Sequence, residues 1–172
     1  MTIEELIQKI KSSTQHKTLY HFTANENLDS IKEYGLLSKQ KLKEKNLWPP
    51  PSPGGNELSR NLDQQSGIDR YVSLCMTQNH PMEYKLRMTG KHITYLKILP
   101  EILKMDGVKV AFGIANGNDM PILPIEKAID GLDINVLYNR TDWSDPEMQA
   151  RLCTAEKYEV LIPDKVSLKF IR

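Results

Sequence analysis

The chain has 172 residues, a formal net charge of +1, 40% hydrophobic residues and 26% charged residues. A chain of this length commonly builds one hydrophobic core, so we expect a single domain over residues 1–172. No apolar run approaches the roughly 20 residues of a transmembrane helix, and we expect a cytoplasmic monomer with no membrane contact. The small net charge excludes indiscriminate binding to duplex DNA, which needs many phosphate contacts. Any contact with nucleic acid must therefore come from a local patch.

Two cysteines, Cys75 and Cys153, lie within or beside apolar stretches. This placement favours buried, reduced thiols over a disulfide scaffold or a cysteine-based zinc site. The histidines are scattered, without a spacing that gathers metal ligands on one element, and we expect no metal. The glycine-rich phosphate cradles of Rossmann folds and P-loops are also absent from the sequence, which argues against nucleotide binding of either kind.

The first third of the chain predicts a helix, a strand and a second helix. Apolar residues recur at helical spacing over residues 3–10, and β-branched and aromatic residues fill residues 18–22. Thr23 and Glu26 have the spacing of a capping box, which predicts that the second helix begins there. Gly35 stands where a left-handed helix end is expected.

Residues 38–69 are the least regular part of the sequence. Four lysines occur among residues 39–45, and Trp48 is followed by three prolines. We expect one long loop here, because so long a connection in a compact domain usually has a function or is disordered. The alternative is a solvated linker without a role.

The rest of the chain predicts more strands than helices. The segment after Asp145 predicts a helix with Pro146 at its favoured first position. Strands are expected at 71–76, 93–98, 108–114, 159–162 and 166–171, and further helical residues at 81–88. These strands are not joined by regular βαβ units of about 30 residues, so an α+β fold is expected.

Two sequence blocks in the first half match a known family. Leu-Tyr-His-Phe-Thr at 19–23 precedes a helix and Tyr-Gly-Leu-Leu at 34–37. Tyr-Val-Ser-Leu at 71–74 then precedes His-Pro-Met-Glu-Tyr at 80–84. The first block resembles the start of an NAD site, and the second resembles a central strand with its following segment, in DarT-like DNA ADP-ribosyltransferase toxins.

A third block completes the resemblance. Trp-Ser-Asp-Pro-Glu at 143–147 leads to Ala-Glu-Lys-Tyr-Glu-Val-Leu-Ile at 155–162 and to Val166. This order resembles the tail that presents the catalytic glutamate in the same family. The blocks span residues 19–171 in the family's order, which is more specific than any one of them alone.

The resemblance implies an ADP-ribosyltransferase-like split β-sheet core with flanking helices and with NAD+ in the cleft. The implied enzyme is an NAD-dependent mono-ADP-ribosyltransferase that modifies a base of single-stranded DNA, as the toxin of a toxin–antitoxin or phage-defence system. A macrodomain antitoxin is the implied partner. An RNA or protein acceptor, or an inactive binding domain of the same fold, remains open as an alternative.

This chemistry needs an arginine and a carboxylate. Cleavage of the bond between nicotinamide and ribose leaves an oxocarbenium-like sugar, so the enzyme must position both substrates and stabilise developing charge. An arginine can grip the pyrophosphate, and a carboxylate can bind a ribose hydroxyl or accept the proton of the attacking base nitrogen.

The resemblance assigns the carboxylate to Glu159 and the guanidinium to Arg60. Glu156 is the alternative carboxylate, because the family has an alanine directly before its glutamate and this chain has Ala155 before Glu156. Arg70, directly before a predicted strand, is the alternative arginine.

The resemblance also places His21 against the NAD ribose, although a lone histidine on a strand is more often a structural residue. The implied NAD-binding residues are Tyr20, His21, Phe22, Thr23, Leu28 and Tyr71. The expected nucleic-acid-binding residues are Trp48, Lys43, Lys45, His80, Met82 and Tyr84. Aromatic rings with nearby positive charge suit single-stranded nucleic acid, and a base must leave a duplex before an enzyme can reach its ring nitrogen.

Overall fold

The computed structural model describes residues 1–54, 61, 63–115, 117, 120–139 and 142–172. Its strands are β1 (Leu19–Ala24), β2 (Leu36–Leu37), β3 (Tyr71–Cys75), β4 (Ile93–Ile98), β5 (Lys109–Ala111), β6 (Ile122–Pro124), β7 (Glu159–Pro163) and β8 (Lys165–Val166). Its α-helices include α1 (Ile3–Ser12), α2 (Leu28–Tyr34), α3 (Lys39–Glu44), α5 (Pro81–Arg87), α6 (Ile125–Ala128), α7 (Ile134–Tyr138) and α8 (Pro146–Ala155). Short 3₁₀ turns lie at η1 (Asn25–Asn27), η2 (Ile68–Arg70), η3 (Pro100–Lys104), η4 (Ile129–Gly131) and η5 (Leu168–Phe170).

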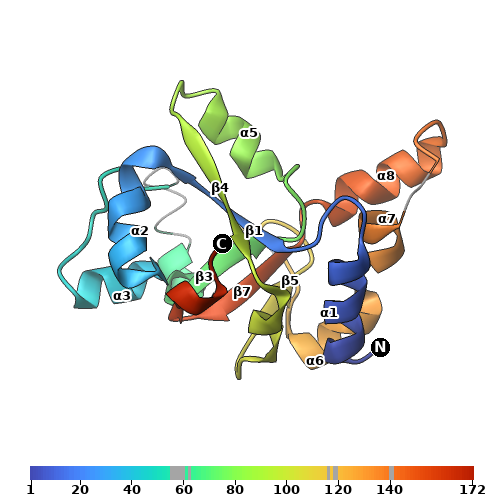
Figure 1. Ribbon diagram of the computed structural model, residues 1–172, viewed down its shortest axis with the longest axis horizontal. Helices are drawn as coiled ribbons and strands as arrows, with labels where there is room; N and C mark the ends of the chain where they lie inside the picture. The colour runs from blue at the N-terminus through green and yellow to red at the C-terminus, as the bar shows by residue number, and fades with distance from the viewer. Residues whose placement is uncertain (55–60, 62, 116, 118–119, 140–141) are drawn as a thin grey trace.

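The α+β class is confirmed. One antiparallel sheet has the strand order β4-β1-β3-β7-β5-β6, and a second, small sheet pairs β2 with β8. Figure 1 shows α1, α6, α7 and α8 gathered at one end of the large sheet, α2 and α3 at the other end, and α5 projecting from it. The sheet therefore lies between two groups of helices.

The large sheet consists of two arms that are joined by very little strand pairing. β1 pairs with β4 along all six of its residues, and β3 pairs with β7 along all five of its own. Between β1 and β3, the described strands share the single Cα pair Tyr20–Cys75. This narrow junction is the form that the expected split sheet takes here. We call β4 and β1 the nucleotide arm, and β3, β7, β5 and β6 the carboxylate arm.

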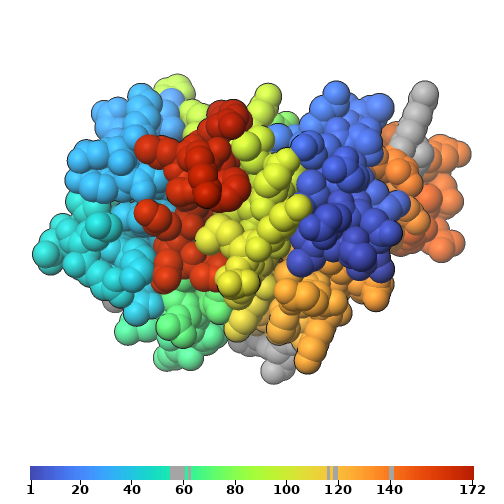
Figure 2. Space-filling model, turned by 60° about the horizontal axis from the view of Figure 1, so that its bottom comes forward, coloured from blue at the N-terminus to red at the C-terminus, as the bar shows by residue number. Residues whose placement is uncertain are grey.

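The hydrophobic core joins the helices of one end to both arms. Helix α1 contributes Leu6 and Ile10, which pack in one cluster with Leu74 of β3, Ile98 of β4 and Ile162 of β7. Figure 2 shows α1 and the C-terminal residues on one face of the molecule, with the segment of β4 and η3 between them. Backbone hydrogen bonds from Leu99 to the carbonyl oxygen of Phe170 and between Lys97 and Arg172 fasten the C-terminus there. Both ends of the chain are thus tied to the β4 side of the sheet.

Two of the local predictions are confirmed. Gly35 ends α2 with φ +80°, and a Cβ at this position would lie 2.4 Å from the carbonyl oxygen of Val166 in β8. Glycine is therefore needed both for the turn and for the close approach of β8. Asp145 caps α8 by accepting a hydrogen bond from the Glu147 amide, with Pro146 at the first helical position as expected.

The capping box expected at Thr23 and Glu26 does not form. Thr23 is still part of β1, and its hydroxyl oxygen accepts a hydrogen bond from the Asn27 side chain at 3.2 Å. The pairing of β1 with β4 continues to Ala24, so the α-helix starts only at Leu28. Tertiary strand pairing thus overrides the local capping preference.

The expected long loop at residues 38–69 contains a helix. Ser38 caps α3 by accepting from the Lys41 amide, so the lysine run stands on a helix rather than in a loop. The strand expected at 166–171 is shorter, because after Val166 the chain turns into η5. The sequence also did not indicate β2, β6, α6 or α7, whose few residues each carry a weak periodic pattern. Cys75 is buried as expected, but Cys153 is exposed on α8.

Candidate active site

The two arms are linked by a side chain just beyond their single shared Cα pair. Nδ1 of His21, on β1, lies 3.0 Å from the carbonyl oxygen of Ser73, on β3. A carbonyl can only accept, so Nδ1 carries a proton and, in the neutral ring, Nε2 is left as the acceptor. Burial lowers the pKa of His21, against a smaller opposing effect of the bond with Ser73, and so favours the neutral ring. The junction thus presents an imidazole acceptor fixed by the neighbouring strand.

Glu159 lies beside this link, at the start of β7. It pairs with Cys75 of β3 and is only 7% exposed. Its Oε2 accepts hydrogen bonds from the Ser73 hydroxyl at 3.2 Å and from the Ala115 amide at 3.3 Å. Ser73 therefore contacts His21 through its carbonyl and Glu159 through its hydroxyl, and so links the two residues.

His80 approaches the other oxygen of the same carboxylate. Its Nε2 lies 3.3 Å from Oε1 of Glu159, and its Nδ1 accepts the Met82 amide at 3.3 Å as the cap of α5. Within the described part of the chain, Nε2 has no partner in hydrogen-bond geometry. The ring is 2% exposed, so it faces Glu159 instead of the molecular surface.

Glu156 has a different setting. It follows the last residue of α8, and its Oε1 accepts a hydrogen bond from the Asn79 side chain at 2.9 Å. Partial burial raises the pKa of Glu156, and the bond to Asn79 opposes this. Of the two carboxylates that the sequence offered, Glu159 is the one that the structure brings against Ser73.

The two candidate arginines are Arg60 and Arg70. Arg60 lies outside the described residues, and its role stays a prediction. Arg70 is exposed and ends η2, directly before β3. Tyr71 pairs with Pro163 while Cys75 pairs with Glu159, so about 13 Å of strand separates Tyr71, the residue after Arg70, from the level of Glu159. The structure does not bring Arg70 to the carboxylate.

Comparisons with known proteins identify the family of the chain. The family model described as "ssDNA thymidine ADP-ribosyltransferase, DarT" matches residues 20–172. The chain belongs to the DarT family. The resemblance inferred from the three sequence blocks is therefore confirmed.

Solved structures of DarT proteins have the same fold. Thermosipho africanus DarTG in complex with ADP-ribose superposes with a TM-score of 0.69 at 20% identity, over 90% of this chain and 42% of that one. Thermus sp. 2.9 DarT in complex with ADP-ribosylated ssDNA gives a TM-score of 0.62 at 16% identity, over 89% of this chain and 78% of that one. Its complex with NAD+ gives 0.58 at 16% identity, over 90% and 78%. This chain thus spans under half of the DarTG chain. A comparison with curated proteins finds no match.

Three of the residues that the DarT resemblance assigns to NAD lie next to His21 on β1. Tyr20 is buried with its ring edge-on to Tyr95, and Thr23 is buried under Asn27. Phe22 is half-buried, and its ring centroid lies 6.1 Å from that of His80. The nucleotide arm and the cap of α5 are therefore in contact through Phe22.

The two remaining NAD candidates lie farther along the chain. Leu28 is the half-buried first residue of α2. Tyr71 opens β3, and the ammonium of Lys109 lies 5.3 Å from its ring centroid. Tyr71 is thus at the end of β3 opposite Cys75, which pairs with Glu159.

Asn27 is a residue of the DarT site region that the sequence did not indicate. Its side chain donates to the Ser52 carbonyl oxygen at 2.8 Å and accepts from the Ser52 amide at 2.9 Å. Lys91 donates to the Ser52 hydroxyl at 2.7 Å. The loop that contains Ser52 is thereby fastened beside Thr23. An asparagine after a strand indicates only a turn, so its distant partner could not be inferred.

The residues expected to bind nucleic acid do not form one set. Lys43 lies 5.6 Å from the centroid of the half-buried Trp48 ring, and Lys45 lies 6.0 Å from that of Tyr34. On α5, Tyr84 is 64% exposed while Met82 is half-buried. His80 departs from the expectation, because it is buried against Glu159.

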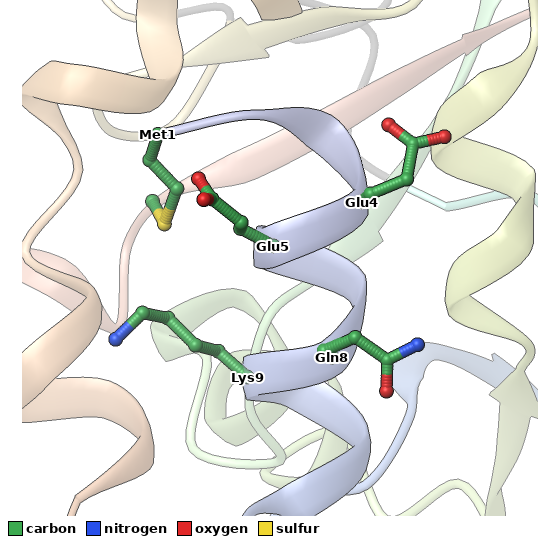
Figure 3. A pocket seen from close by; sticks show the side chains of 5 residues that line it. All are labelled: Met1, Glu4, Glu5, Gln8 and Lys9. Atoms are coloured by element: carbon green, nitrogen blue, oxygen red, sulfur yellow. The ribbon is translucent and has the colours of Figure 1, made fainter.

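A surface depression on α1 is separate from this site. Figure 3 shows its lining side chains splayed to both sides of the helix. They are Met1, Glu4, Glu5, Gln8 and Lys9. The N-terminal ammonium pairs with Asp130, and Glu5 caps its own helix with Thr2, so these charges serve local structure. Among the described residues, no three acidic, histidine or cysteine side chains gather as a metal site. Within those residues, none of the helices is long and apolar enough to cross a bilayer.

Proposed function

We propose that this protein transfers ADP-ribose from NAD+ to a thymidine base of single-stranded DNA. The observation that carries the proposal is the buried carboxylate of Glu159, whose Oε2 accepts from Ser73 and Ala115, with the carbonyl oxygen of the same Ser73 bonded by His21. Membership of the DarT family supports the reaction. Relatives in complex with NAD+ and with ADP-ribosylated ssDNA support the two substrates.

His21 and its neighbours on β1 are proposed to hold NAD+. Its neutral ring has Nε2 as acceptor, which suits a ribose hydroxyl. Tyr20, Phe22 and Thr23 flank it, with Leu28 and Tyr71 as further contacts. Arg60 is proposed to grip the pyrophosphate, a role that rests on the sequence.

Glu159 is proposed as the general base. The ring nitrogen N3 of thymine attacks C1′ of the ribose, and nicotinamide leaves with the electron pair of the broken bond. The proton of N3 passes to the Glu159 carboxylate. Because Oε2 is held by Ser73 and Ala115, Oε1 is the oxygen that takes this proton. In a duplex N3 is engaged in base pairing, so an unpaired base is required.

The acceptor strand is proposed to contact aromatic rings and lysines near α3 and on α5. The exposed Tyr84 offers a stacking surface with Met82 as a further contact, and the half-buried Trp48 has the ammonium of Lys43 beside its ring. Lys45, whose ammonium lies against the Tyr34 ring, adds positive charge. Stacking on aromatic rings holds single strands with little dependence on sequence. The choice of thymidine then depends on the pocket around Glu159.

The proposal is tested by incubating the protein with NAD+ labelled in the adenylate half and with oligonucleotides of equal length. Label should pass to single strands that contain thymidine, and neither to thymidine-free strands nor to the same sequence in a duplex. RNA and bulk protein in the same reaction serve as competing acceptors. Label on RNA or protein alone would replace the acceptor, and no transfer to any of them would overturn the proposal.

NAD+ binding is measured separately from transfer. Saturating NAD+ should raise the melting temperature, because a ligand that binds only the folded state stabilises it by mass action. We further infer, from family membership, a toxin role with a macrodomain antitoxin as partner. Co-expression with such a macrodomain should relieve growth inhibition, and an equal loss of growth with and without it would contradict the inference.

A further inference from the structure

His80 is a buried polar side chain that the proposed reaction does not use. It is 2% exposed, and its Nε2 has no partner in hydrogen-bond geometry within the described part of the chain. Leaving such a group unsatisfied is costly in a protein interior, so its surroundings call for a role. The nearest charged group is Glu159, whose Oε1 lies 3.3 Å from Nε2.

The other ring nitrogen fixes the tautomer. Nδ1 accepts the Met82 amide at 3.3 Å, which requires a lone pair on Nδ1. With the lone pair of Nδ1 used by this cap, the ring proton is on Nε2, which lies 3.3 Å from Oε1 of Glu159 without yet being in hydrogen-bond geometry with it. Protonation of Nδ1 would end the cap of α5. The hydrogen-bond requirement of the helix thus selects the tautomer that can donate to Glu159.

The position of the ring is also fixed. Pro81 follows as the first residue of α5, and the Phe22 ring packs 6.1 Å from the imidazole. His80 is therefore held between the helix start and β1, which belongs to the nucleotide arm.

We propose that His80 is a positioning residue for Glu159, an inference that rests on the proposed function. When both substrates are bound, Nε2–H donates to one lone pair of Oε1 and leaves the other lone pair toward the base nitrogen. Ser73 and Ala115 hold Oε2, so three donors from separate segments fix the plane of the carboxylate. His80 takes no proton itself. Its loss should therefore reduce the rate of transfer without weakening NAD+ binding.

Two substitutions separate the nitrogens of the ring. In His80→Asn the amide oxygen can still accept the Met82 amide, because asparagine is a favoured helix cap, but nothing replaces Nε2–H. In His80→Gln the longer side chain returns an N–H donor near the position of Nε2, while the cap is lost. We expect kcat to fall about tenfold in the Asn variant, with an unchanged KM for NAD+ and an unchanged melting temperature, as for one lost hydrogen bond to a charged group.

The Gln variant should give the opposite result. Its kcat should stay within about threefold of the wild type, while its melting temperature falls by about 2–4 °C for the lost cap. A kcat that follows the melting temperature across the two variants would assign His80 a merely structural role and overturn the proposal. Wild-type kcat in His80→Asn would overturn it as well.

A measurement without catalysis keeps this inference distinct from the proposed function. The ¹⁵N chemical shifts of the His80 ring in the wild-type protein should show Nε2 protonated and Nδ1 bare. A proton on Nδ1 would overturn the positioning role even if the protein transfers ADP-ribose. The expected tautomer in a protein that transfers no label to any acceptor would instead count against the proposed function.

Discussion

The two arms of the large sheet differ in how their polar groups are held. In the carboxylate arm, Glu159 is fixed by Ser73 of the adjacent strand and by the Ala115 amide, and His80 lies 3.3 Å from its other oxygen. In the nucleotide arm, His21 is fixed by one contact to Ser73 and by ring packing. The Glu159 carboxylate is thus held by hydrogen bonds before any substrate binds. The nucleotide arm instead offers aromatic rings and one oriented acceptor, Nε2 of His21.

This difference between the arms depends on the place where the pairing of β1 with β3 stops. Within a continuous ladder, backbone carbonyls are used by the next strand. Where β1 and β3 part after Tyr20 and Cys75, the Ser73 carbonyl is free to accept from a side chain. The interrupted pairing therefore supplies the group that orients His21. Substitutions in each arm separately test this division.

Removing the charge of Glu159 should have the largest effect. In Glu159→Gln the side chain keeps its shape but no longer accepts a proton, so kcat for ADP-ribose transfer should fall at least ~100-fold. Label transfer to single-stranded DNA measures this loss, and the rise in melting temperature with NAD+ should remain.

Glu156→Gln is the matched control. Its partner Asn79 can still be bonded by the amide oxygen, and kcat should stay within about twofold. If Glu156→Gln abolishes transfer and Glu159→Gln does not, the catalytic carboxylate belongs to the end of α8.

Replacing His21 should affect the nucleotide arm next. His21→Ala removes both the proposed ribose contact and the link to Ser73, so the affinity for NAD+ should fall about tenfold, as for one or two lost hydrogen bonds. The dependence of the melting temperature on NAD+ concentration measures it. The exposed His92, replaced by alanine, is the control and should leave that curve unchanged. An unaltered curve in His21→Ala would remove His21 from the NAD+ site.

Glu159 and His21 also show which features of the site could be predicted from the sequence. The strand of Glu159 could be predicted because β-branched and apolar residues follow it, and the strand of His21 is equally clear. The partners of both residues could not be predicted, since they come from strand register and not from spacing. Ser73 was detectable only as a polar residue in the apolar run 71–76, and nothing in the sequence tied Ala115 to Glu159.

The misplaced expectations have a common physical origin. The lysines at residues 39–45 indicated a loop because their charge masked a short helix whose stability depends on the Ser38 cap. His80 was expected to bind nucleic acid, whereas here it caps α5 and is buried beside Phe22 and Glu159. Short elements and buried polar groups depend on tertiary contacts more than on local pattern.

A change beside the small β2–β8 sheet should lower stability more than activity. Gly35→Ala strains a positive φ and forces Cβ against the Val166 carbonyl oxygen, so the β2–β8 pair must shift. We expect the melting temperature to fall by about 4–8 °C, corresponding to roughly 2 kcal/mol in a chain of this size, with kcat per folded molecule retained.

Gly67→Ala separates the two causes. Gly67 also has a positive φ, +69°, but a Cβ there would meet no atom within 4 Å among the described residues. Its melting temperature should fall by about 2 °C or less, since strain alone acts and alanine restricts the unfolded chain. Equal losses in the two variants would show that the contact with Val166 does not matter.

The smallest expected effect is on the pH dependence of stability. It arises from His21 on β1 and from His16, which precedes β1. Burial lowers the pKa of His21 and of His16 below the ordinary value of 6.5. The unfolded chain then binds more protons than the folded one as the pH falls through this value, so the melting temperature should decrease from pH 7 toward pH 5. His21→Gln should flatten part of this slope. Because a protonated His21 has no acceptor at Nε2, the wild-type affinity for NAD+ should fall only as the pH approaches the lowered pKa of the folded His21, below 6.5, whereas His16→Gln should change the stability profile alone. A melting temperature that rises on acidification would contradict the burial of both rings as neutral groups.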